Sequence, residues 1–305
     1  MIFIKNRLIK LSKLKPVIFL DQLLFRIKDD AVLASGTQLA YFLILSMFPF
    51  IIVFLNLLSY TPLVREDVLG GMIMYLPLET QNLIEGFVSE ISISSSQGLL
   101  SIAAFLGLWT ASSGLSAVIK AINRAYDYEE SRSFIKLKLI SLIFTLALLI
   151  LLTLVFLTLV FGEVLGNKLF SLFGLTDIFR YLWAYLRIII PLVYMVLIFA
   201  LLYKFSPCVS KIKEIPFVRT LPGAIFASLG WMLISIFFSY YVNNFGRYAI
   251  TYGSLVGIIL LLIWLYISSI IIILGGEINA TINHFKTYGY RLHNDKSIIS
   301  KRLGK

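Results

Sequence analysis

The sequence predicts an all-α, polytopic membrane protein with six transmembrane helices and with both termini in the cytoplasm. Six stretches contain no Asp, Glu, Lys or Arg, namely 31–64, 91–119, 139–162, 188–203, 220–246 and 248–276. An apolar helix needs about 20 residues to cross a bilayer core of roughly 30 Å. Five stretches are long enough outright. The fourth becomes long enough if its flanking Arg187 and Lys204 extend their charged ends towards the interfaces.

The composition agrees with a bilayer as the solvent. Hydrophobic residues make up 59% and charged residues 14% of the 305-residue chain, against about 25% charged residues in soluble domains, and the mean hydropathy is +0.91. The apolar runs lack the roughly ten-residue alternation of a membrane β-barrel. We therefore expect one membrane domain, 31–280, between a basic cytoplasmic arm, 1–30, and a basic cytoplasmic tail, 281–305.

The positive charges support the count of six spans. With six crossings, 22 of the 27 lysines and arginines fall on one side of the membrane, and the positive-inside rule places that side in the cytoplasm. The net charge of +11 is thus read as a topology signal rather than as a nucleic-acid-binding surface. We expect no nucleic-acid partner.

The N-terminal arm mixes Ile, Leu and Phe with Lys and Arg over residues 2–27. This pattern predicts a basic amphipathic helix on the cytoplasmic leaflet, with a flexible basic tail as the alternative. Charges interrupt every apolar run before residue 31, so we expect no cleavable signal peptide.

The first span, about 33–60, carries few polar side chains. Gln38 and Tyr41 lie one helical turn apart and share a face, where they either bond to another helix or contact a substrate. Pro49 lies deep in the apolar stretch and removes a backbone hydrogen bond, so we expect a kink there.

The second span, about 98–119, has small and hydroxylic residues directly after Trp109. Among them, Ser112, Ser113 and Gly114 suit close helix packing or substrate contact. At the cytoplasmic end, Asn123 and Arg124 form either a structural network or part of a ligand site.

Two predicted external loops look amphipathic. Within the first predicted external loop, about 61–97, the apolar residues of 83–91 fall on one helical face. The region 163–187 carries several Phe, Leu and Ile residues. We expect interfacial helices, or apolar lids, in both loops.

The remaining spans are expected at about 138–162, 185–204, 220–243 and 249–276. Arg187 enters the fourth span four residues before Pro191, a second expected kink, and it either snorkels, pairs with Glu163 or binds an anionic headgroup. Gly253 and Gly257 have the GxxxG spacing of close helix packing at the start of the sixth span.

Glu277 ends the sixth span, where a carboxylate is costly to keep. It either pairs with Arg124 or Lys120, acts as a gate or proton site, or is a plain helix-end carboxylate.

Soluble-style catalysis has little support. The chain has two histidines and one cysteine, Cys208, and it lacks HExxH, Walker A and GxSxG motifs and metal-spaced carboxylates. We expect no catalytic residue, no cofactor and no metal site.

Several segments together resemble the YihY / virulence factor BrkB family of bacterial inner-membrane proteins. They are ASGTQLAY (34–41) with FP (48–49), LWTASSG (108–114) with AINRAY (121–126), LPGA (221–224), and YGSL (252–255) through LIWLY (262–266) to LGGEINA (274–280). The resemblance spans about residues 30–285, with Gly276 in place of an expected Ala. Tyr252 and Asn279, from these segments, join the candidate substrate-binding residues.

The resemblance implies six spans in a bacterial plasma membrane. Members have often carried the label ribonuclease BN, which the residues here do not support. Links of the family to envelope lipids favour a transporter or flippase of an anionic lipid or amphiphile, with anionic membrane lipids as partners. The alternatives are a non-transporting scaffold or envelope-assembly protein and, third, a ribonuclease.

Overall fold

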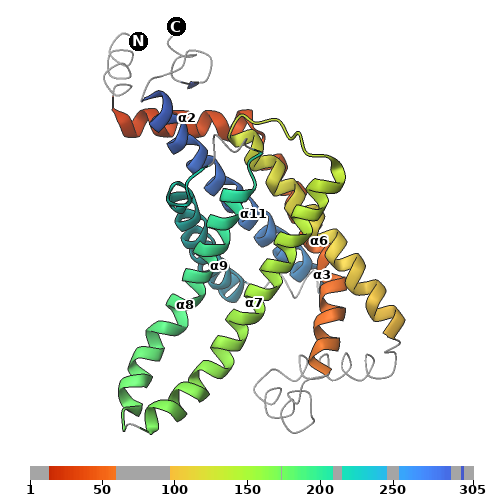
Figure 1. The fold of residues 1–305 in the computed structure, drawn as a ribbon, viewed down its shortest axis with the longest axis vertical. Helices are drawn as coiled ribbons and strands as arrows, with labels where there is room; N and C mark the ends of the chain where they lie inside the picture. The colour runs from red at the N-terminus through yellow and green to blue at the C-terminus, as the bar shows by residue number, and fades with distance from the viewer. Residues whose placement is uncertain are drawn as a thin grey trace. The chain divides into compact units, whose positions relative to one another are not determined.

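The computed structural model describes residues 14–59, 97–172, 174–208, 215–245, 254–289 and 297–298. The regular secondary structure of these residues is entirely helical, which confirms the predicted all-α class (Figure 1). The elements are α2 (Lys15–Asp29), α3 (Val32–Ser59), α6 (Gln97–Ala125), α7 (Phe134–Ser171), α8 (Thr176–Phe205), the 3₁₀-helix η3 (Phe217–Arg219), α9 (Leu221–Phe245) and α11 (Ser254–Tyr288).

Each predicted span overlaps a helix of the described residues. Within the described residues, four helical segments are long and apolar enough to cross a membrane: Phe105–Ala125, Thr176–Phe205, Leu221–Tyr241 and Gly257–Thr287. Helices α3 and α7 have 28 and 38 residues, but the structure does not describe the side chains in part of each helix. A multi-pass membrane protein is therefore supported, while six spans and cytoplasmic termini stay predictions.

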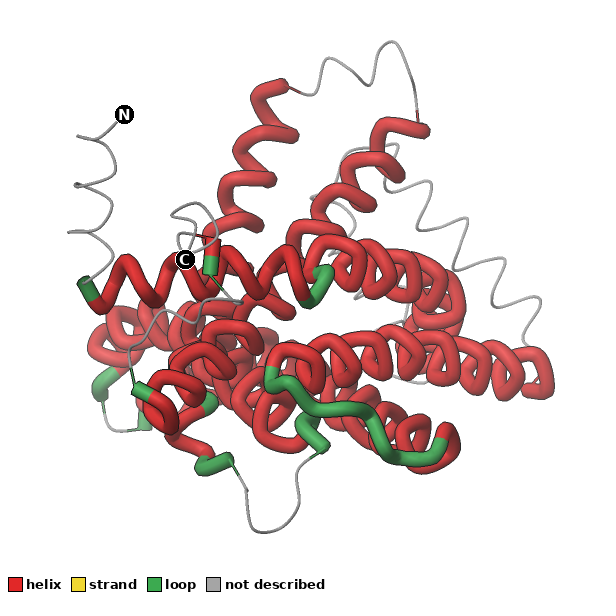
Figure 2. Tube along the Cα trace, turned by 90° about the horizontal axis from the view of Figure 1, so that it is seen from above, coloured by secondary structure: helices red, strands yellow, loops and turns green. Residues whose placement is uncertain are grey.

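The chain divides into two units, residues 1–40 with 115–305 and residues 41–114, and each is described by itself. In the first unit, α9 packs against both α8 and α11, α7 packs against α8, and α2 packs against α11. Figure 2 shows this group of helices from above. The second unit contains the later part of α3 and the earlier part of α6.

Glycines allow α8, α9 and α11 to approach one another closely. A Cβ added to Gly223 would lie 1.9 Å from the carbonyl oxygen of Gly275, and one added to Gly275 would lie 2.3 Å from the hydroxyl of Tyr203. That hydroxyl donates to the carbonyl oxygen of Ile272 at 2.6 Å. The LPGA and LGGEINA segments are thus the contact points between helices.

The separate interfacial helix predicted over 163–187 is wrong, and an apolar lid there stays a prediction. Helix α7 continues to Ser171 and α8 begins at Thr176, so these residues are the ends of two long helices joined by a short turn. The interfacial helix predicted within 61–97 lies outside the described residues. Helix α11 also continues past the predicted end of its span at residue 276, to Tyr288.

The predicted amphipathic helix of the N-terminal arm is present as α2, but its polar side faces the protein. Asp21, Gln22 and Arg26 are buried, whereas Leu20 and Leu24 are each 56% exposed. Helix α2 lies across the C-terminal part of α11 (Figure 1). Its polar residues thus reach the interior of the first unit.

Candidate functional site

The candidate site is a cluster of four charged side chains, Arg26, Asp30, Asp127 and Glu277, which we call the carboxyl–arginine cluster. Arg26 comes from α2, Asp30 follows α2, Asp127 follows α6 and Glu277 lies on α11. Arg26 is buried, and its guanidinium donates to the carbonyl oxygen of Ala125 and pairs with Asp127 at 3.3 Å. The cluster therefore joins three helices of the first unit.

Glu277 is the most deeply buried member of the cluster. Its exposure is 0%, and neither of its carboxylate oxygens accepts a hydrogen bond from an N–H or hydroxyl group of the described residues. Its charged neighbours are Asp30, Arg26 and Asp127, and its carboxyl lies within hydrogen-bonding reach of that of Asp30. Two carboxyl groups can form such a bond only when one of them carries the proton.

The surroundings of Asp30 raise the pKa of its carboxyl group. Burial raises its pKa from an ordinary 3.8 to about 6. The positive charges of Arg26 and Arg124 oppose this rise, while the negative charges of Asp127 and Asp29 add to it. Asp30 is thus poised to bind a proton near neutral pH.

The backbone on both sides of the cluster adopts an uncommon conformation. Within the described part of the chain, the non-glycine residues with positive φ are Ala31, at 51°, and Asp127, at 57°. Asp tolerates this left-handed region, but Ala does so at a cost of about 1–2 kcal/mol. Such residues often accompany functional sites.

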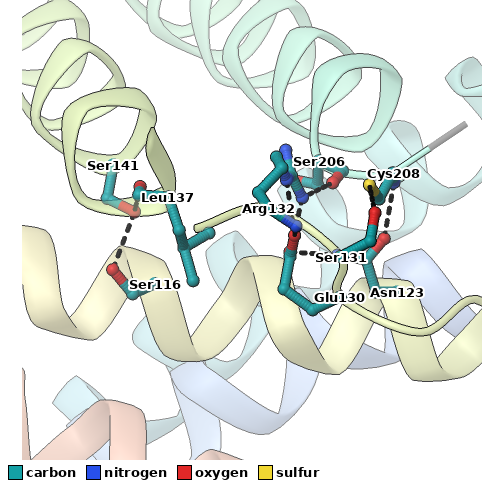
Figure 3. A network of polar contacts seen from close by, with 9 residues as sticks. All are labelled: Ser116, Asn123, Glu130, Ser131, Arg132, Leu137, Ser141, Ser206 and Cys208. Atoms are coloured by element: carbon teal, nitrogen blue, oxygen red, sulfur yellow. Dashed lines mark hydrogen bonds and ion pairs between the residues drawn. The ribbon is translucent and has the colours of Figure 1, made fainter. Parts of the chain in front are cut away.

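The predicted candidate Asn123 belongs to a second polar network, which also contains Cys208 and is shown in Figure 3. The amide of buried Asn123 donates to Glu130 at 2.7 Å and accepts from the backbone N–H of Cys208 at 2.6 Å. The Cys208 sulfur also lies 3.2 Å from the hydroxyl of Ser131. This network fastens the connection between α6 and α7 to the end of α8.

Arg132 completes this network. It bonds to Glu130 through two contacts of 2.6 Å and donates to the carbonyl oxygen of Ser206, the C-cap of α8, at 2.7 Å. A guanidinium at a helix C-terminus satisfies orphan carbonyls and complements the helix dipole. Burial alone would raise the pKa of Glu130, but Arg132 lowers it below the ordinary value.

Asn279 is fully buried and holds helices together. Its oxygen accepts from the backbone N–H of Gly223 at 2.7 Å, and its amide donates to the carbonyl oxygen of Thr220 at 2.9 Å. Both backbone groups lie at the start of α9, where helix amides lack partners of their own. Asn279 on α11 therefore caps α9, which is a structural role.

Two candidate residues of the second predicted span, Ser112 and Ser113, form hydrogen bonds within their own helix. The hydroxyls of Ser112 and Ser113 donate to the carbonyl oxygen of Trp109 at 2.7 and 3.1 Å. The exposed Trp109 ring stacks on Phe105 with centroids 5.9 Å apart, and Gly114 is buried.

The other predicted site residues are not gathered into a cluster. Gln38, Tyr41, Arg124 and Arg187 are each exposed, although Arg124 also donates to the hydroxyl of Ser35 at 2.5 Å. The hypothesis that Glu277 pairs with Arg124 or Lys120 is wrong, because its charged neighbours are those named above. The suggested partner of Arg187, Glu163, lies among side chains outside the description.

The predicted kink and packing residues have mixed outcomes. Pro191 lies inside α8 and Pro49 inside α3, both of which continue past the proline. A Cβ on Gly257 would meet no described atom within 4 Å, so the expected close packing there is not found among the described residues. Tyr252 and Gly253 lie outside the description.

The sequence reasoning missed Arg26 and Asp30 because both were assigned to a cytoplasmic arm. A signal was available in the order of residues along α2. Asp21, Gln22 and Arg26 recur with helical spacing, so they mark a polar face next to a predicted membrane domain. In the described residues, no group of three or more His, Cys, Asp or Glu side chains is placed to hold a metal ion.

Comparison with known proteins gives consistent matches over nearly the whole chain. The family model described as Virulence factor BrkB matches residues 23–297. A Bacillus subtilis protein named "Putative ribonuclease-like protein YfkH" is 40% identical over 268 residues, which cover 88% of this chain and 96% of the relative.

Other relatives are named as membrane proteins. A "UPF0761 membrane protein" of Pseudoalteromonas atlantica is 28% identical, covering 89% of this chain and 88% of its own. A UPF0761 membrane protein of Alteromonas mediterranea is 27% identical, covering 84% and 85%. No solved structure matches this chain.

Proposed function

The chain belongs to the virulence factor BrkB family, a group of multi-pass bacterial membrane proteins, and from this premise we propose that it moves an anionic lipid or amphiphile across the plasma membrane. The family membership agrees with the resemblance carried by the sequence. The proposal concerns the activity, which the names of the relatives leave open.

The burial of Glu277 is the observation that carries the proposal. A carboxyl group within a membrane helix is costly to bury, and ionisable residues at such positions mark transport or proton pathways in many membrane proteins. Glu277 has no hydrogen-bond donor among the described N–H and hydroxyl groups.

Exposed basic residues on α2 and α6 supply a means of attracting the substrate. Lys28 on α2 and Lys120 and Arg124 on α6 are exposed near the ends of their helices. Each such charge contributes about 1 kcal/mol of attraction to an anionic lipid surface. They favour an anionic headgroup over a zwitterionic one at the predicted cytoplasmic side.

The test is lipid movement between leaflets in vesicles that contain the purified protein. A fluorescent phosphatidylglycerol is expected to exchange between leaflets faster than in empty vesicles, and faster than a matched fluorescent phosphatidylcholine. Equal rates with and without folded protein, for both lipids, would rule out the proposal.

A non-transporting scaffold is the second candidate. Two of the predicted substrate contacts, Asn123 and Asn279, support it. Their side-chain amides form hydrogen bonds that hold helices and connecting segments together. A scaffold predicts no lipid movement, together with co-purification of a specific envelope protein.

A ribonuclease is the third candidate, supported by the name of the Bacillus subtilis relative. The vesicle preparation allows a direct test with labelled RNA. Cleavage that persists in a homogeneous preparation and follows the protein through gel filtration would favour this candidate over transport.

A further inference from the structure

We propose that Asp30 and Glu277 form one proton-binding site, in which two carboxyl groups share a single proton, and that this proton is the coupling ion of the transporter. The coupling part rests on the proposed function. The proton site itself does not, because it depends only on the arrangement of the two carboxyls.

The first step is the contact between the two carboxyl groups. Glu277 is fully buried on α11 and lacks an N–H or hydroxyl donor among the described residues, and the carboxyl within hydrogen-bonding reach belongs to Asp30. Two ionised carboxylates repel each other at this range, whereas a singly protonated pair forms a hydrogen bond. The contact is therefore stable with one proton present.

The second step is the charge around the pair. The facing groups come from α2 and from α6 with the turn that follows it; they are Arg26, Asp29, Arg124 and Asp127. Of these, Arg26 is already paired with Asp127, and Arg124 bonds to Ser35. The phenol of Tyr126 is also close to Glu277. Arg26, the cation that acts on both carboxyls, is thus paired with a third carboxylate, and Arg124 keeps its charge beside Asp30, so a proton balances the charge of Glu277.

The third step is the path and the balance of the proton. Asp30 is only partly buried and lies between α2 and α3, so it exchanges protons with water. Loading forms one O–H bond between a proton from water and a carboxylate oxygen, and the charge of the pair falls from −2 to −1. Release breaks the same bond and returns the proton to water.

The fourth step links the site to a moving part. Ala31, directly after Asp30, has a positive φ of 51°, which a non-glycine residue adopts at a cost. Full ionisation of the pair would push Asp30 away from α11 and would allow this corner between α2 and α3 to relax. The occupancy of the site by a proton thereby sets the position of α2 on α11.

The proton site is tested by the titration of Asp30 in the purified protein. With ¹³C-labelled aspartate, the carboxyl signal assigned by its loss in Asp30→Asn is expected to titrate with a pKa of about 6. Burial and the negative charges of Asp127 and Asp29 raise this pKa without Glu277, so folded Glu277→Gln protein is expected to keep the Asp30 step and to lose the second proton step of the pair. The control, Asp177→Asn, changes a side chain that is 97% exposed and should leave the Asp30 signal unchanged.

Two results would overturn the proton site. One is an Asp30 carboxyl that titrates at its ordinary value of 3.8 in the wild-type protein. This result needs only the Asp30→Asn variant, which assigns the signal. The other is folded Glu277→Gln protein that binds as many protons as the wild type over the same titration.

The coupling is tested separately in vesicles with labelled phosphatidylglycerol. A pH gradient is expected to change the rate of lipid movement in the wild type and to have no effect in Glu277→Gln. Lipid movement that ignores the gradient in the wild type would overturn the coupling. If no lipid moves while Asp30 still titrates as expected, the proposed function fails and the proton site stands.

Discussion

Asn279 shows how a polar residue in a membrane helix can serve structure rather than substrate. It satisfies one N–H and one C=O group at the start of α9, and a buried backbone group left without a partner costs about 1–3 kcal/mol. The sequence placed Asn279 in a distinctive segment but could not reveal this partner, because Gly223 lies 56 residues away in the chain.

Replacement of Asn279 by Ala is expected to destabilise the protein by about 1–3 kcal/mol, because the buried N–H of Gly223 loses its partner, while the carbonyl of Thr220 keeps the N–H of Ala224. Thermal unfolding in detergent measures this loss. Equal melting temperatures for wild type and Asn279→Ala would contradict the capping role.

Gly223 offers a second test at a single residue. An added Cβ would meet the backbone carbonyl of Gly275 at 1.9 Å, and overpacking of this kind costs about 1–3 kcal/mol. Gly230 on the same helix is the matched control, because its Cβ would meet only the flexible side chain of Ile271 at 3.1 Å.

We expect Gly223→Ala to lower the melting temperature clearly and Gly230→Ala to change it little. The two variants add the same methyl group to α9, so the difference isolates the contact with α11. Similar melting temperatures for both variants would show that α9 and α11 do not approach as described.

At the scale of the element, α2 differs most from its sequence-based interpretation. The helix itself follows from the mixture of Ile, Leu and basic residues, but its orientation does not. Periodicity reveals that two faces exist, and only tertiary contacts decide that Asp21 and Arg26 face the protein while Leu20 and Leu24 are exposed. The fold class and the positions of the apolar helices, by contrast, follow from uninterrupted apolar length.

The junction after α2 predicts a pH dependence of stability. Asp30 has a pKa of about 6 in the folded protein and an ordinary value of 3.8, so the folded state binds the proton more tightly. Its contribution to stability is fully present below pH 3.8 and is lost as the pH rises through about 6.

The Asp30→Asn variant cannot ionise at this position and should lack that loss. Its melting temperature relative to wild type is therefore expected to rise between pH 4 and pH 7, which spans the shift described. A difference that stays constant over this range, or that falls with pH, would contradict the assignment of the raised pKa to Asp30.

At the scale of the whole molecule, the sequence predicts a multi-pass membrane protein, and the four apolar helical segments and the family membership support it. The candidate site was predictable only in part. Glu277 stands out as a charge at the end of a span, but Arg26 and Asp30 come from a segment more than 240 residues earlier in the chain. Such a pairing depends on long-range packing, which composition and periodicity do not encode.

The central claim is that a buried carboxyl cluster serves the movement of an anionic amphiphile. The most direct measurement is the leaflet-exchange rate of labelled phosphatidylglycerol in vesicles that contain equal amounts of folded wild-type, Glu277→Gln or Asp177→Asn protein. We expect rapid exchange for wild type and Asp177→Asn and at least a tenfold slower exchange for Glu277→Gln, a change of about 1.4 kcal/mol in the barrier. Exchange at the rate of empty vesicles for the wild type, or equal rates for all three proteins, would contradict it.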